Sequence, residues 1–365
     1  MRVGLLTGGG DCPGLNAVLR AVTKALVLRC GAEVVGFEDG YRGLIENQYR
    51  PLGYRDVSGI LTRGGTILGT SNTANPFAYY GAGGADVSDR ALAHYEALGL
   101  DALVAVGGDG TMSIAHGLQQ KGMRVVGVPK TIDNDLVGTD RTFGFDTAVM
   151  IATEAVDRLH TTAQSHHRVM ILETMGRYAG WIALHTGVAS GADVVLIPEI
   201  PYRIEEVVRV CRARERGGQQ FTIIVMAEGA IPEGGEVTVK RVVEGSHDPI
   251  RLGGACQVLG YALEQHLESE VRTTILGHVQ RGGTPTPFDR VLSTRFGTHA
   301  AHLVAEGRSG LMVALREGRL TEIPFEEVAH KVRTVPRDAP LIQAAVDVGT
   351  SFGVPELSPV LERMR

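Results

Sequence analysis

The stretch 129–135, Pro-Lys-Thr-Ile-Asp-Asn-Asp, holds the residue types best suited to chemistry. Two carboxylates, Asp133 and Asp135, stand beside the hydroxyl of Thr131. In an extended segment these three side chains would point the same way, because side chains alternate along a strand. One carboxylate could act as a general base and the other as a metal ligand, with Lys130 facing a phosphate. Asx-type turn chemistry would explain the Asn-Asp end but not the whole run.

Two glycine-rich stretches could hold a phosphate chain. Gly-Gly-Asp-Gly-Thr at 107–111 offers close backbone approach, one carboxylate and one hydroxyl. Asp109 could hold Mg²⁺ there, while amide groups at a helix start face phosphate oxygens. Thr-Gly-Gly-Gly-Asp at 7–11 also opens a predicted helix, and Gly10 would let the backbone approach an anion. A tight turn capped by Asp109, and a plain strand–helix turn at 7–11, are the alternatives.

Basic and acidic residues also mark the ends of later apolar runs. Arg168 precedes one run and Arg177 follows it, and such guanidinium forks suit phosphate. Glu228 follows another run and could accept hydrogen bonds from sugar hydroxyls. His278 could donate to a phosphate, with a structural histidine as the alternative reading. The other two arginines of this basic set are Arg272 and Arg281.

These residues together are the parts that phosphoryl transfer needs, because positioning and charge neutralisation carry most of that catalysis. Composition excludes several other classes. The net charge is −5 with no Lys/Arg run, which argues against nucleic acid as a partner. No run approaches a membrane span, and the first ten residues predict a buried strand and no signal peptide. Four scattered cysteines without a CxxC pair indicate reduced thiols in a cytoplasmic protein.

The elements that position these residues follow one pattern. A short apolar run ends in a cluster of glycine and polar residues, as parallel strands buried on both faces do. Helical patterns lie between the runs and predict open α/β sheets, whose ligands bind beyond the carboxyl ends of the strands. The runs are 3–6, 102–106, 125–128, 169–172, 221–226 and 274–276, and the helical patterns are 15–28, 145–159 and 204–214.

The sequence also predicts the domain organisation and the segments without a functional role. A length of 365 residues favours two domains, and the second α/β unit begins near Gly144. The stretch 80–89 reads as an exposed loop, and the basic helix 207–216 as a solvated face. The last 35 or so residues, with four prolines, carry little functional signal.

At this point the chain resembles the 6-phosphofructokinase family, in its mixed ATP and pyrophosphate type. The motifs GGDGT, PKTIDND, SHHR, MGR, AEG and LGHVQRGG occur in the family's order across residues 1–300. The resemblance implies an α/β fold with two Rossmann-like three-layer domains, mainly parallel sheets and an active site in the cleft between them. It implies a donor domain of 1–144 plus about 280–330, and a sugar-phosphate domain of 145–279 plus the C-terminal segment. A homo-oligomer, dimer or tetramer, is also implied.

The resemblance further implies a reaction and a role for each matching residue. Fructose 6-phosphate would be phosphorylated at its 1-hydroxyl with Mg²⁺ and ATP, or reversibly with pyrophosphate. Asp133 would be the base, with Thr131 and Arg177 as its catalytic companions, and Asp109 and Asp135 would serve the metal. The donor residues would be Gly10, Gly108, Asp109, Gly110, Thr111 and Tyr41. The sugar-phosphate residues would be Thr131, Asp133, Met175, Gly176, Arg177, Glu228, His278 and Arg281, with Arg168 and Arg272 from a neighbouring chain.

The choice of donor depends on two residues that point in opposite directions. In the resemblance, a bulky acid at position 110 would occupy the space of a nucleotide α-phosphate, and Gly110 leaves that space open. Lys130 is common among the pyrophosphate users. Steric exclusion is the harder constraint, so ATP is favoured and pyrophosphate is the alternative.

Two departures from the family pattern bear on the donor site and on regulation. The stretch 64–69 is followed by Thr-Ser-Asn, where many ATP enzymes have an arginine. Arg20 and Lys24 match the first helix of the family's effector site, but His160 stands where an arginine is expected. Gly and Gln at 217–220 replace its basic cluster. Weak or absent allosteric control is therefore expected.

Overall fold

The chain forms two compact units in the computed structural model, which describes residues 1–242 and 250–359. Unit 1 comprises Met1–Thr147 and Arg281–Arg333. Unit 2 comprises Ala148–Val242, Ile250–Gln280 and residues 334–359. The assignment of donor binding to one unit and of sugar-phosphate binding to the other stays a prediction.

Unit 1 is built on a seven-stranded sheet in the order β13-β12-β5-β4-β1-β2-β3. The five inner strands run parallel, while the edge strands β3 and β13 are antiparallel to their neighbours. The strands β1, β4 and β5 are buried almost throughout, as continuous apolar runs require. The strands are β1 (Arg2–Thr7), β2 (Glu33–Phe37), β3 (Tyr49–Pro51), β4 (Ala102–Gly107), β5 (Val125–Pro129), β12 (Leu311–Arg316) and β13 (Arg319–Pro324).

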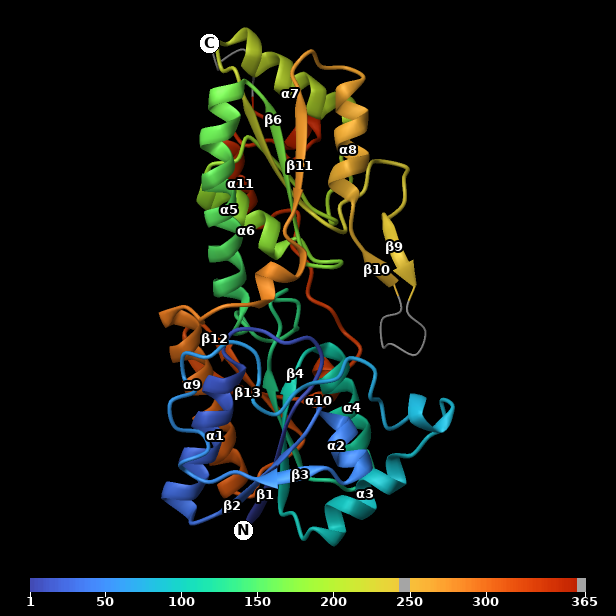
Figure 1. The fold of residues 1–365 in the computed structure, drawn as a ribbon, viewed down its shortest axis with the longest axis vertical. Helices are drawn as coiled ribbons and strands as arrows, with labels where there is room; N and C mark the ends of the chain where they lie inside the picture. Colours follow the sequence, from blue (N-terminus) through green and yellow to red (C-terminus); the bar gives the residue numbers. More distant parts are fainter. Residues whose placement is uncertain (243–249, 360–365) are drawn as a thin grey trace. The chain divides into compact units, whose positions relative to one another are not determined.

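Helices cover both faces of this sheet (Figure 1). On one face α1 (Leu15–Cys30) packs against α9 (Pro287–Ala305), closely enough that a Cβ on Gly297 would lie 2.8 Å from Cβ of Ala21. The other face carries an apolar core shared by the sheet and four helices, with Phe37, Met112 and Phe325 among its buried members. Those helices are α2 (Tyr41–Glu46), α3 (Ser88–Ala97), α4 (Asp109–Gln120) and α10 (Phe325–Val328).

Unit 2 repeats this layered arrangement on a smaller, fully parallel sheet. Its strands are β6 (Val169–Thr174), β7 (Val194–Leu196), β8 (Thr222–Ala227) and β11 (Val271–Ile275), in the order β11-β6-β8-β7. The helices α7 (Ile204–Arg216) and α8 (Ala255–Glu264) share a buried core with one face of the sheet. Figure 1 shows α5 (Phe145–His166), α6 (Trp181–Ser190) and α11 (Pro340–Asp347) on the other side.

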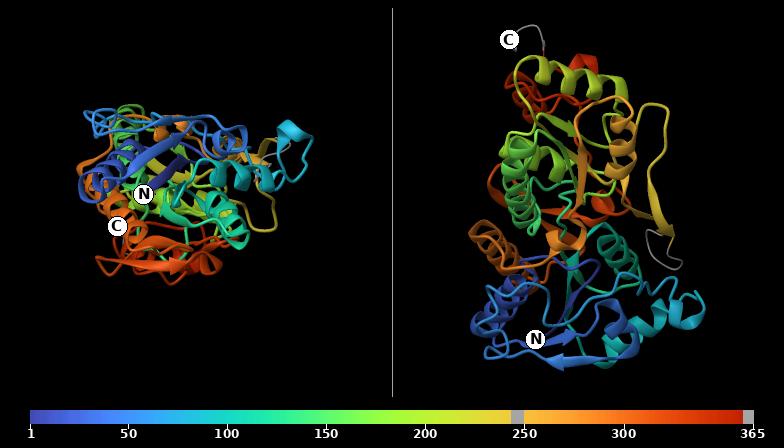
Figure 2. Two further views of the ribbon diagram at one scale, coloured as in Figure 1. Left: turned by 90° about the horizontal axis from the view of Figure 1, so that it is seen from below. Right: turned by 45° about the horizontal axis from the view of Figure 1, so that its top comes forward.

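Two segments stand outside these layers (Figure 2). In unit 2, β9 (Val239–Val242) and β10 (Ile250–Leu252) form a separate antiparallel pair. In unit 1, the helical turn η1 (Tyr80–Ala82) lies in a largely exposed excursion. The exposed loop predicted for 80–89 is correct up to Val87 and wrong for the last two residues, because Ser88 is buried at the start of α3. Short helical turns also occur at η2 (Gly277–Arg281) and η3 (Pro355–Leu357). None of the helices in the described ranges combines the length and the apolar run that crossing a membrane requires.

The predicted fold class is confirmed by these two layered α/β units with mainly parallel sheets. Each predicted apolar run overlaps a strand, although β11 begins three residues earlier than the run at 274–276. Strands such as β2, β7 and β12 were not predicted, although the polar cluster Glu38-Asp39-Gly40 directly follows β2. All four cysteines are free thiols.

Candidate active site

The first turn of α4 presents the Gly-Gly-Asp-Gly-Thr motif at the carboxyl end of β4. Gly108 precedes the helix in an extended conformation, and Asp109 is its first residue. Helix geometry leaves the amide groups of such a first turn without carbonyl partners inside the helix. Amide groups with this orientation, at the positive end of the helix dipole, suit phosphate oxygens. The predicted donor residues 108–111 therefore share one helix start.

The side chain of Thr111 explains two neighbouring glycines. A Cβ on Gly107 would lie 2.2 Å from Thr111 Oγ1, and a Cβ on Gly8 would lie 2.7 Å from it. The hydroxyl thus fills the space between the ends of β1 and β4. Tyr41 is buried and donates its hydroxyl to the carbonyl of Thr111 at 2.9 Å, and burial raises its pKa. Tyr41 supports the first turn of α4 through this bond.

The loop after β1 is held by several groups that the sequence motifs did not link. Gly9 has a left-handed φ of 78°, and its N–H donates to the carbonyl of Ser71 at 3.1 Å. Thr70 donates its hydroxyl to the carbonyl of Gly9 at 2.6 Å. The residues that replace the expected arginine therefore bind the loop backbone, and the Gly9 N–H is occupied by the protein itself.

Two cations also face this loop. Lys130, which is 3% exposed, donates to the carbonyl of Gly10. Arg281 donates to the carbonyl of Asp11 at 3.1 Å, and its Nη1 would lie 2.7 Å from a Cβ on Gly10. A side chain at position 10 would therefore displace this guanidinium. Arg281 belongs to unit 1 and His278 to unit 2, so the two predicted phosphate ligands fall in different units.

The acidic loop after β5 is not the extended segment that the sequence predicted. β5 ends at Pro129, and Asn134 adopts a left-handed φ of 53°. The alternation argument for Thr131, Asp133 and Asp135 was therefore wrong, because a residue at positive φ breaks the strand geometry. Thr142 stabilises the turn: its N–H donates to Asn134 Oδ1 at 3.0 Å and its hydroxyl to the Thr131 carbonyl at 2.8 Å.

Asp133 combines burial with an unused acceptor. The residue is 5% exposed, and its Oδ2 lies 3.4 Å from Thr131 Oγ1, which donates to it. Its backbone N–H donates to the same hydroxyl at 3.0 Å. Its Oδ1 is buried and has no hydrogen-bond partner among the described residues. Buried acceptors are almost always satisfied, so this oxygen is suited to the hydroxyl proton of a bound substrate.

The residues predicted to serve Mg²⁺ are Asp109, on the first turn of α4, and Asp135, on the acidic loop. Mg²⁺ prefers oxygen ligands and usually takes one or two carboxylates, with phosphate oxygens and water completing its shell. Across residues 1–242 and 250–359, no group of three or more His, Cys, Asp or Glu is placed to bind a metal. Two carboxylates and a phosphate loop at neighbouring strand ends fit an ion that arrives with the donor.

In unit 2, four of the residues predicted to bind sugar phosphate lie at the carboxyl ends of two strands: Met175, Gly176 and Arg177 follow β6, and Glu228 follows β8. Gly176 has a φ of 140° and Arg177 a φ of 51°, so the chain turns sharply after β6. The Arg177 N–H donates to Glu228 Oε1 at 3.2 Å. A Cβ on Gly229 would lie 2.0 Å from the Arg177 carbonyl, which explains the glycine after Glu228. The MGR and AEG motifs therefore form one structural feature.

Two further residues in this part of unit 2 were missed by the sequence reasoning. Gln280 is fully buried and accepts a hydrogen bond from the Met175 N–H at 2.7 Å, which ties the segment carrying His278 to β6. Glu173 accepts hydrogen bonds from the N–H groups of Gly254 and Cys256, at the start of α8. The only sequence signals for these roles were the place of Gln280 within the GHVQRGG motif and that of Glu173 two residues before MGR.

The two arginines predicted to serve a neighbouring chain share one carboxylate. Arg168 donates to Glu270 Oε2 at 2.6 Å, and Arg272 lies 3.1 Å from the same oxygen. Arg272 also donates to the carbonyl of Val271 at 2.9 Å. The adjacent guanidinium groups lower the pKa of Glu270, first through the hydrogen bond from Arg168. Glu270 therefore holds both arginines at one place on the surface of unit 2.

The residue that departs from the family's effector pattern is engaged locally. His160 bonds through Nε2 to the carbonyl of Ser190 at 3.0 Å and packs edge-on against Phe221. Nearby in unit 2, Arg214 forms an ion pair with the half-buried Asp193 at 2.7 Å. Lys24, in unit 1, lies over the ring of Tyr54.

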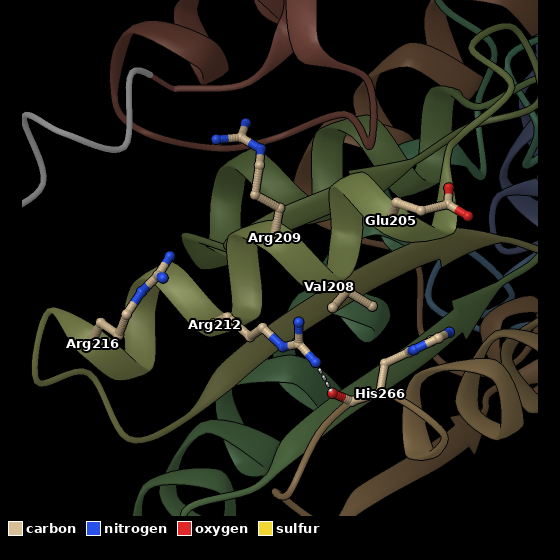
Figure 3. Close-up of a pocket in the computed structure, with 6 residues that line it drawn as sticks. All are labelled: Glu205, Val208, Arg209, Arg212, Arg216 and His266. Atoms are coloured by element: carbon tan, nitrogen blue, oxygen red, sulfur yellow. Dashed lines mark hydrogen bonds between the residues drawn. The ribbon is translucent and has the colours of Figure 1, made fainter.

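A separate surface pocket of about 300 Å³ lies along α7 (Figure 3). Arg209 donates to the carboxylate of Glu206, and Arg212 donates to the carbonyl of His266 at 2.6 Å. Two of its three arginines are therefore already paired with protein acceptors, as expected for a solvated basic face. Its lining contains none of the predicted site residues and consists of Glu205, Val208, Arg209, Arg212, Arg216 and His266.

Comparison with known proteins places this geometry among enzymes of one kind. Residues 2–304 match the protein-family model described as phosphofructokinase. An ATP-dependent 6-phosphofructokinase of Clostridium perfringens is 51% identical over 96% of this chain and 98% of its own length. A pyrophosphate–fructose 6-phosphate 1-phosphotransferase of Amycolatopsis methanolica is 52% identical over 92% of this chain and 96% of its own length.

Solved structures agree on the fold. The phosphofructokinase of Saccharomyces cerevisiae matches 89% of this chain with a TM-score of 0.76 and 31% identity. The chain spans about half the length of that yeast protein, 45% of which is covered. A pyrophosphate-dependent phosphofructokinase of Marinobacter aquaeolei matches 98% of this chain and 95% of its own, with a TM-score of 0.78. At 20% identity, the second likeness concerns the fold alone.

Proposed function

Since the chain belongs to the phosphofructokinase family, we propose that it phosphorylates the 1-hydroxyl of fructose 6-phosphate, with ATP as donor and Mg²⁺ as cofactor. The product is fructose 1,6-bisphosphate, and the reaction serves glycolysis. The observation that carries this assignment is the buried Oδ1 of Asp133, which has no hydrogen-bond partner in the described part of the chain. A relative about half identical over nearly its whole length bears the corresponding name.

The chemistry divides between the residues of the two units. Asp133 takes the proton of the sugar 1-hydroxyl at Oδ1, while Thr131 holds the other carboxylate oxygen. The first turn of α4 and the Gly10 loop orient the donor phosphates through backbone groups. Asp109 and Asp135 would hold Mg²⁺, which would neutralise charge on the transferring phosphoryl group.

Sugar recognition is assigned to residues of unit 2 together with Arg281 of unit 1. Arg177 and Glu228, joined through the Arg177 N–H, bind the sugar and its hydroxyls. His278 and Arg281 bind the 6-phosphate, and Met175 with Gly176 shapes the sugar site. Because phosphoryl transfer is mostly positioning and charge stabilisation, small displacements of these groups lower the rate.

Pyrophosphate is the second candidate donor, and a specific observation favours it. Lys130 is buried against the Gly10 loop, where a compact anion of high charge density would meet its ammonium group. The Amycolatopsis relative is named for pyrophosphate. Gly110 still favours ATP, because nothing at that position blocks an α-phosphate.

The test is a donor comparison with fructose 6-phosphate and Mg²⁺. We expect ³¹P NMR to show fructose 1,6-bisphosphate forming with ATP, at a kcat/KM that exceeds the value with pyrophosphate. Faster turnover with pyrophosphate would reverse the choice of donor and leave the acceptor assignment intact. Absence of fructose 1,6-bisphosphate with both donors would overturn the function.

Assembly, control and location complete the proposal. A homo-oligomer, dimer or tetramer, is supported by the exposed pairing of Arg168 and Arg272 on Glu270, which presents two guanidinium groups to a neighbour. Weak allosteric control is supported by the local engagement of His160. A cytoplasmic location is supported by four free thiols.

A further inference from the structure

We propose that Arg333 is a positioning residue that fixes the two peptide groups flanking Asp135 and so aims the predicted metal carboxylate. The inference deepens the proposed function, since it concerns how that site holds its metal. Residue 333 lies outside the stretch 2–304 that matches the family model. It also lies in the C-terminal part of the chain for which the sequence predicted little function.

Arg333 contacts the acidic loop through both its backbone and its side chain. Its N–H donates to the carbonyl of Asp135 at 2.7 Å. Its Nη1 donates to the carbonyl of Asn134 at 3.3 Å and to that of Asp140 at 3.2 Å. One residue therefore binds three carbonyls of the loop, all of them within unit 1.

Two of these carbonyls belong to the peptide groups on either side of Asp135. The carbonyl of Asn134 belongs to the peptide group before Asp135, and the carbonyl of Asp135 to the peptide group after it. Backbone conformation is set by only two soft dihedrals per residue, and these lie between those two planes. Fixing both planes therefore fixes the direction in which the Asp135 side chain leaves the backbone.

The restraint acts on a sharp turn of the loop. Asn134 sits at a φ of 53°, the left-handed conformation that is uncommon among non-glycine residues and that asparagine adopts more readily than most. Thr142 donates to the Asn134 side chain, which in turn donates to the carbonyl of Asp140. Arg333 adds a bond to the Asn134 carbonyl.

The Arg333 guanidinium remains suited to its position although the side chain is half-buried. Burial lowers the pKa of Arg333, and the neighbouring Arg141 acts in the same direction, while Asp140 opposes both. An arginine stays charged under these conditions, since its guanidinium does not lose its proton in proteins. Its fixed fork of donors also lets one group serve two carbonyls, which a lysine does less well.

The same stretch also supports the other predicted metal carboxylate. His330 donates its N–H to Ser113 Oγ at 3.0 Å, and Ser113 donates its hydroxyl to the carbonyl of Asp109 at 2.9 Å. Residues 330–333 thus contact both the first turn of α4 and the acidic loop. One four-residue segment therefore stabilises, through hydrogen bonds, both segments that carry Asp109 and Asp135.

The test compares Arg333→Met with Arg295→Met, which removes a similar half-buried guanidinium elsewhere in unit 1. Arg295 donates to the carbonyl of Gly318 at 2.9 Å, and no site residue depends on it. Mn²⁺ serves as the probe, titrated by electron paramagnetic resonance in the presence of pyrophosphate or a non-hydrolysable ATP analogue. Arg333→Met should weaken Mn²⁺ binding about tenfold, as loss of a residue that orients a metal ligand does. Arg333→Lys should recover part of that loss, and Arg295→Met should bind like wild type.

The outcomes separate this proposal from the proposed function. Equal Mn²⁺ binding in wild type, Arg333→Met and Arg295→Met would overturn the positioning role, even if the protein phosphorylates fructose 6-phosphate. Loss of fructose 6-phosphate turnover in wild type would overturn the function and leave the metal result standing. If Arg333→Met does not fold, Arg333→Lys decides: binding equal to wild type, with hydrogen exchange of residues 131–142 unchanged, would contradict the proposal.

Discussion

At position 110, the lack of a side chain bears on the choice of donor. Gly110 is the second residue of α4, so an acid there would sit in a first helical turn, where negative charge is tolerated. Gly110→Asp should therefore keep its Tm but lose on the order of 10²-fold or more in kcat/KM for ATP, through bulk and repulsion of the α-phosphate. Activity with pyrophosphate should change far less.

Gly110→Asn is the matched control, because it has the same bulk without the charge. Steady-state kinetics with both donors would show an intermediate loss with ATP if bulk and charge both count. Unchanged ATP kinetics in Gly110→Asp would show that the residue at 110 does not select the donor.

Residue by residue, the sequence singled out candidate ligand-binding groups more readily than the groups that hold them in place. Asp109 and Glu228 were proposed because they follow apolar runs, at the strand ends where ligands bind in open α/β sheets. Lys130 on the Gly10 carbonyl and Gln280 on the Met175 N–H could not be found, since such partners are set by tertiary packing. Arg333 lies about two hundred positions from the loop that it binds, with no motif around it.

At the scale of elements, a buried network joins the starts of α5 and α9. Asp289 Oδ2 accepts from the N–H of Thr147 at 2.9 Å and from its hydroxyl at 2.6 Å. Thr286 caps α9 by accepting from the Asp289 N–H, and donates its hydroxyl to Asp146 at 2.6 Å. The start of α5 is thus capped by Asp289 of α9, whereas α9 is capped by its own Thr286, and the bond from Thr286 to Asp146 joins the two helix starts. These bonds anchor the segment returning to unit 1.

This network predicts a pH dependence of stability. Burial raises the pKa of Asp289 from 3.8 to about 6, with the charge of nearby Asp146 adding to the effect. The folded-state pKa is the higher one, so the contribution of Asp289 is complete below pH 4 and is lost as pH rises through 6. Asp289→Asn should therefore gain stability relative to wild type over this range, by up to about 3 kcal/mol.

Urea unfolding at intervals from pH 4 to pH 8 measures this difference. Asp338→Asn, at an exposed carboxyl, serves as the control and should follow wild type throughout. Parallel stability curves for Asp289→Asn and wild type would show that Asp289 titrates alike in the folded and unfolded chain.

The helices and strands were predicted where the apolar residues follow a single clear pattern along the sequence. The helix α7 was recognised because its buried valines recur at helical spacing, and β4 because its apolar run is unbroken. The acidic loop was misread as extended because alternating polar residues imitate a strand. Its actual shape depends on Asn134 and on Thr142, eight residues further on, which no local pattern connects.

At the scale of the whole molecule, the account requires more than one chain per active site. Arg168 and Arg272 converge on Glu270, which fixes their guanidinium groups together on the surface of unit 2. A chain lacking both arginines would retain its own Asp133, and a chain with Asp133→Asn would retain both arginines. In a dimer that contains one chain of each variant, one of the two active sites would then have both an intact Asp133 and the two arginines.

Co-expression of Asp133→Asn with the double variant Arg168→Ala, Arg272→Ala should therefore restore activity. Random dimers would reach roughly a quarter of the wild-type rate, because half of them contain one complete site out of two. The measurement is the specific activity of the purified mixture against each parent alone. Activity no greater than the average of the parents would show that the arginines act within their own chain.

The central claim is that the unpartnered oxygen of Asp133 removes the proton from the acceptor hydroxyl. The most direct measurement is kcat for fructose 6-phosphate in Asp133→Asn, which keeps the shape of the side chain and the Thr131 contact. The account predicts a fall in kcat of about 10²-fold or more with little change in KM. A kcat near that of wild type would contradict it.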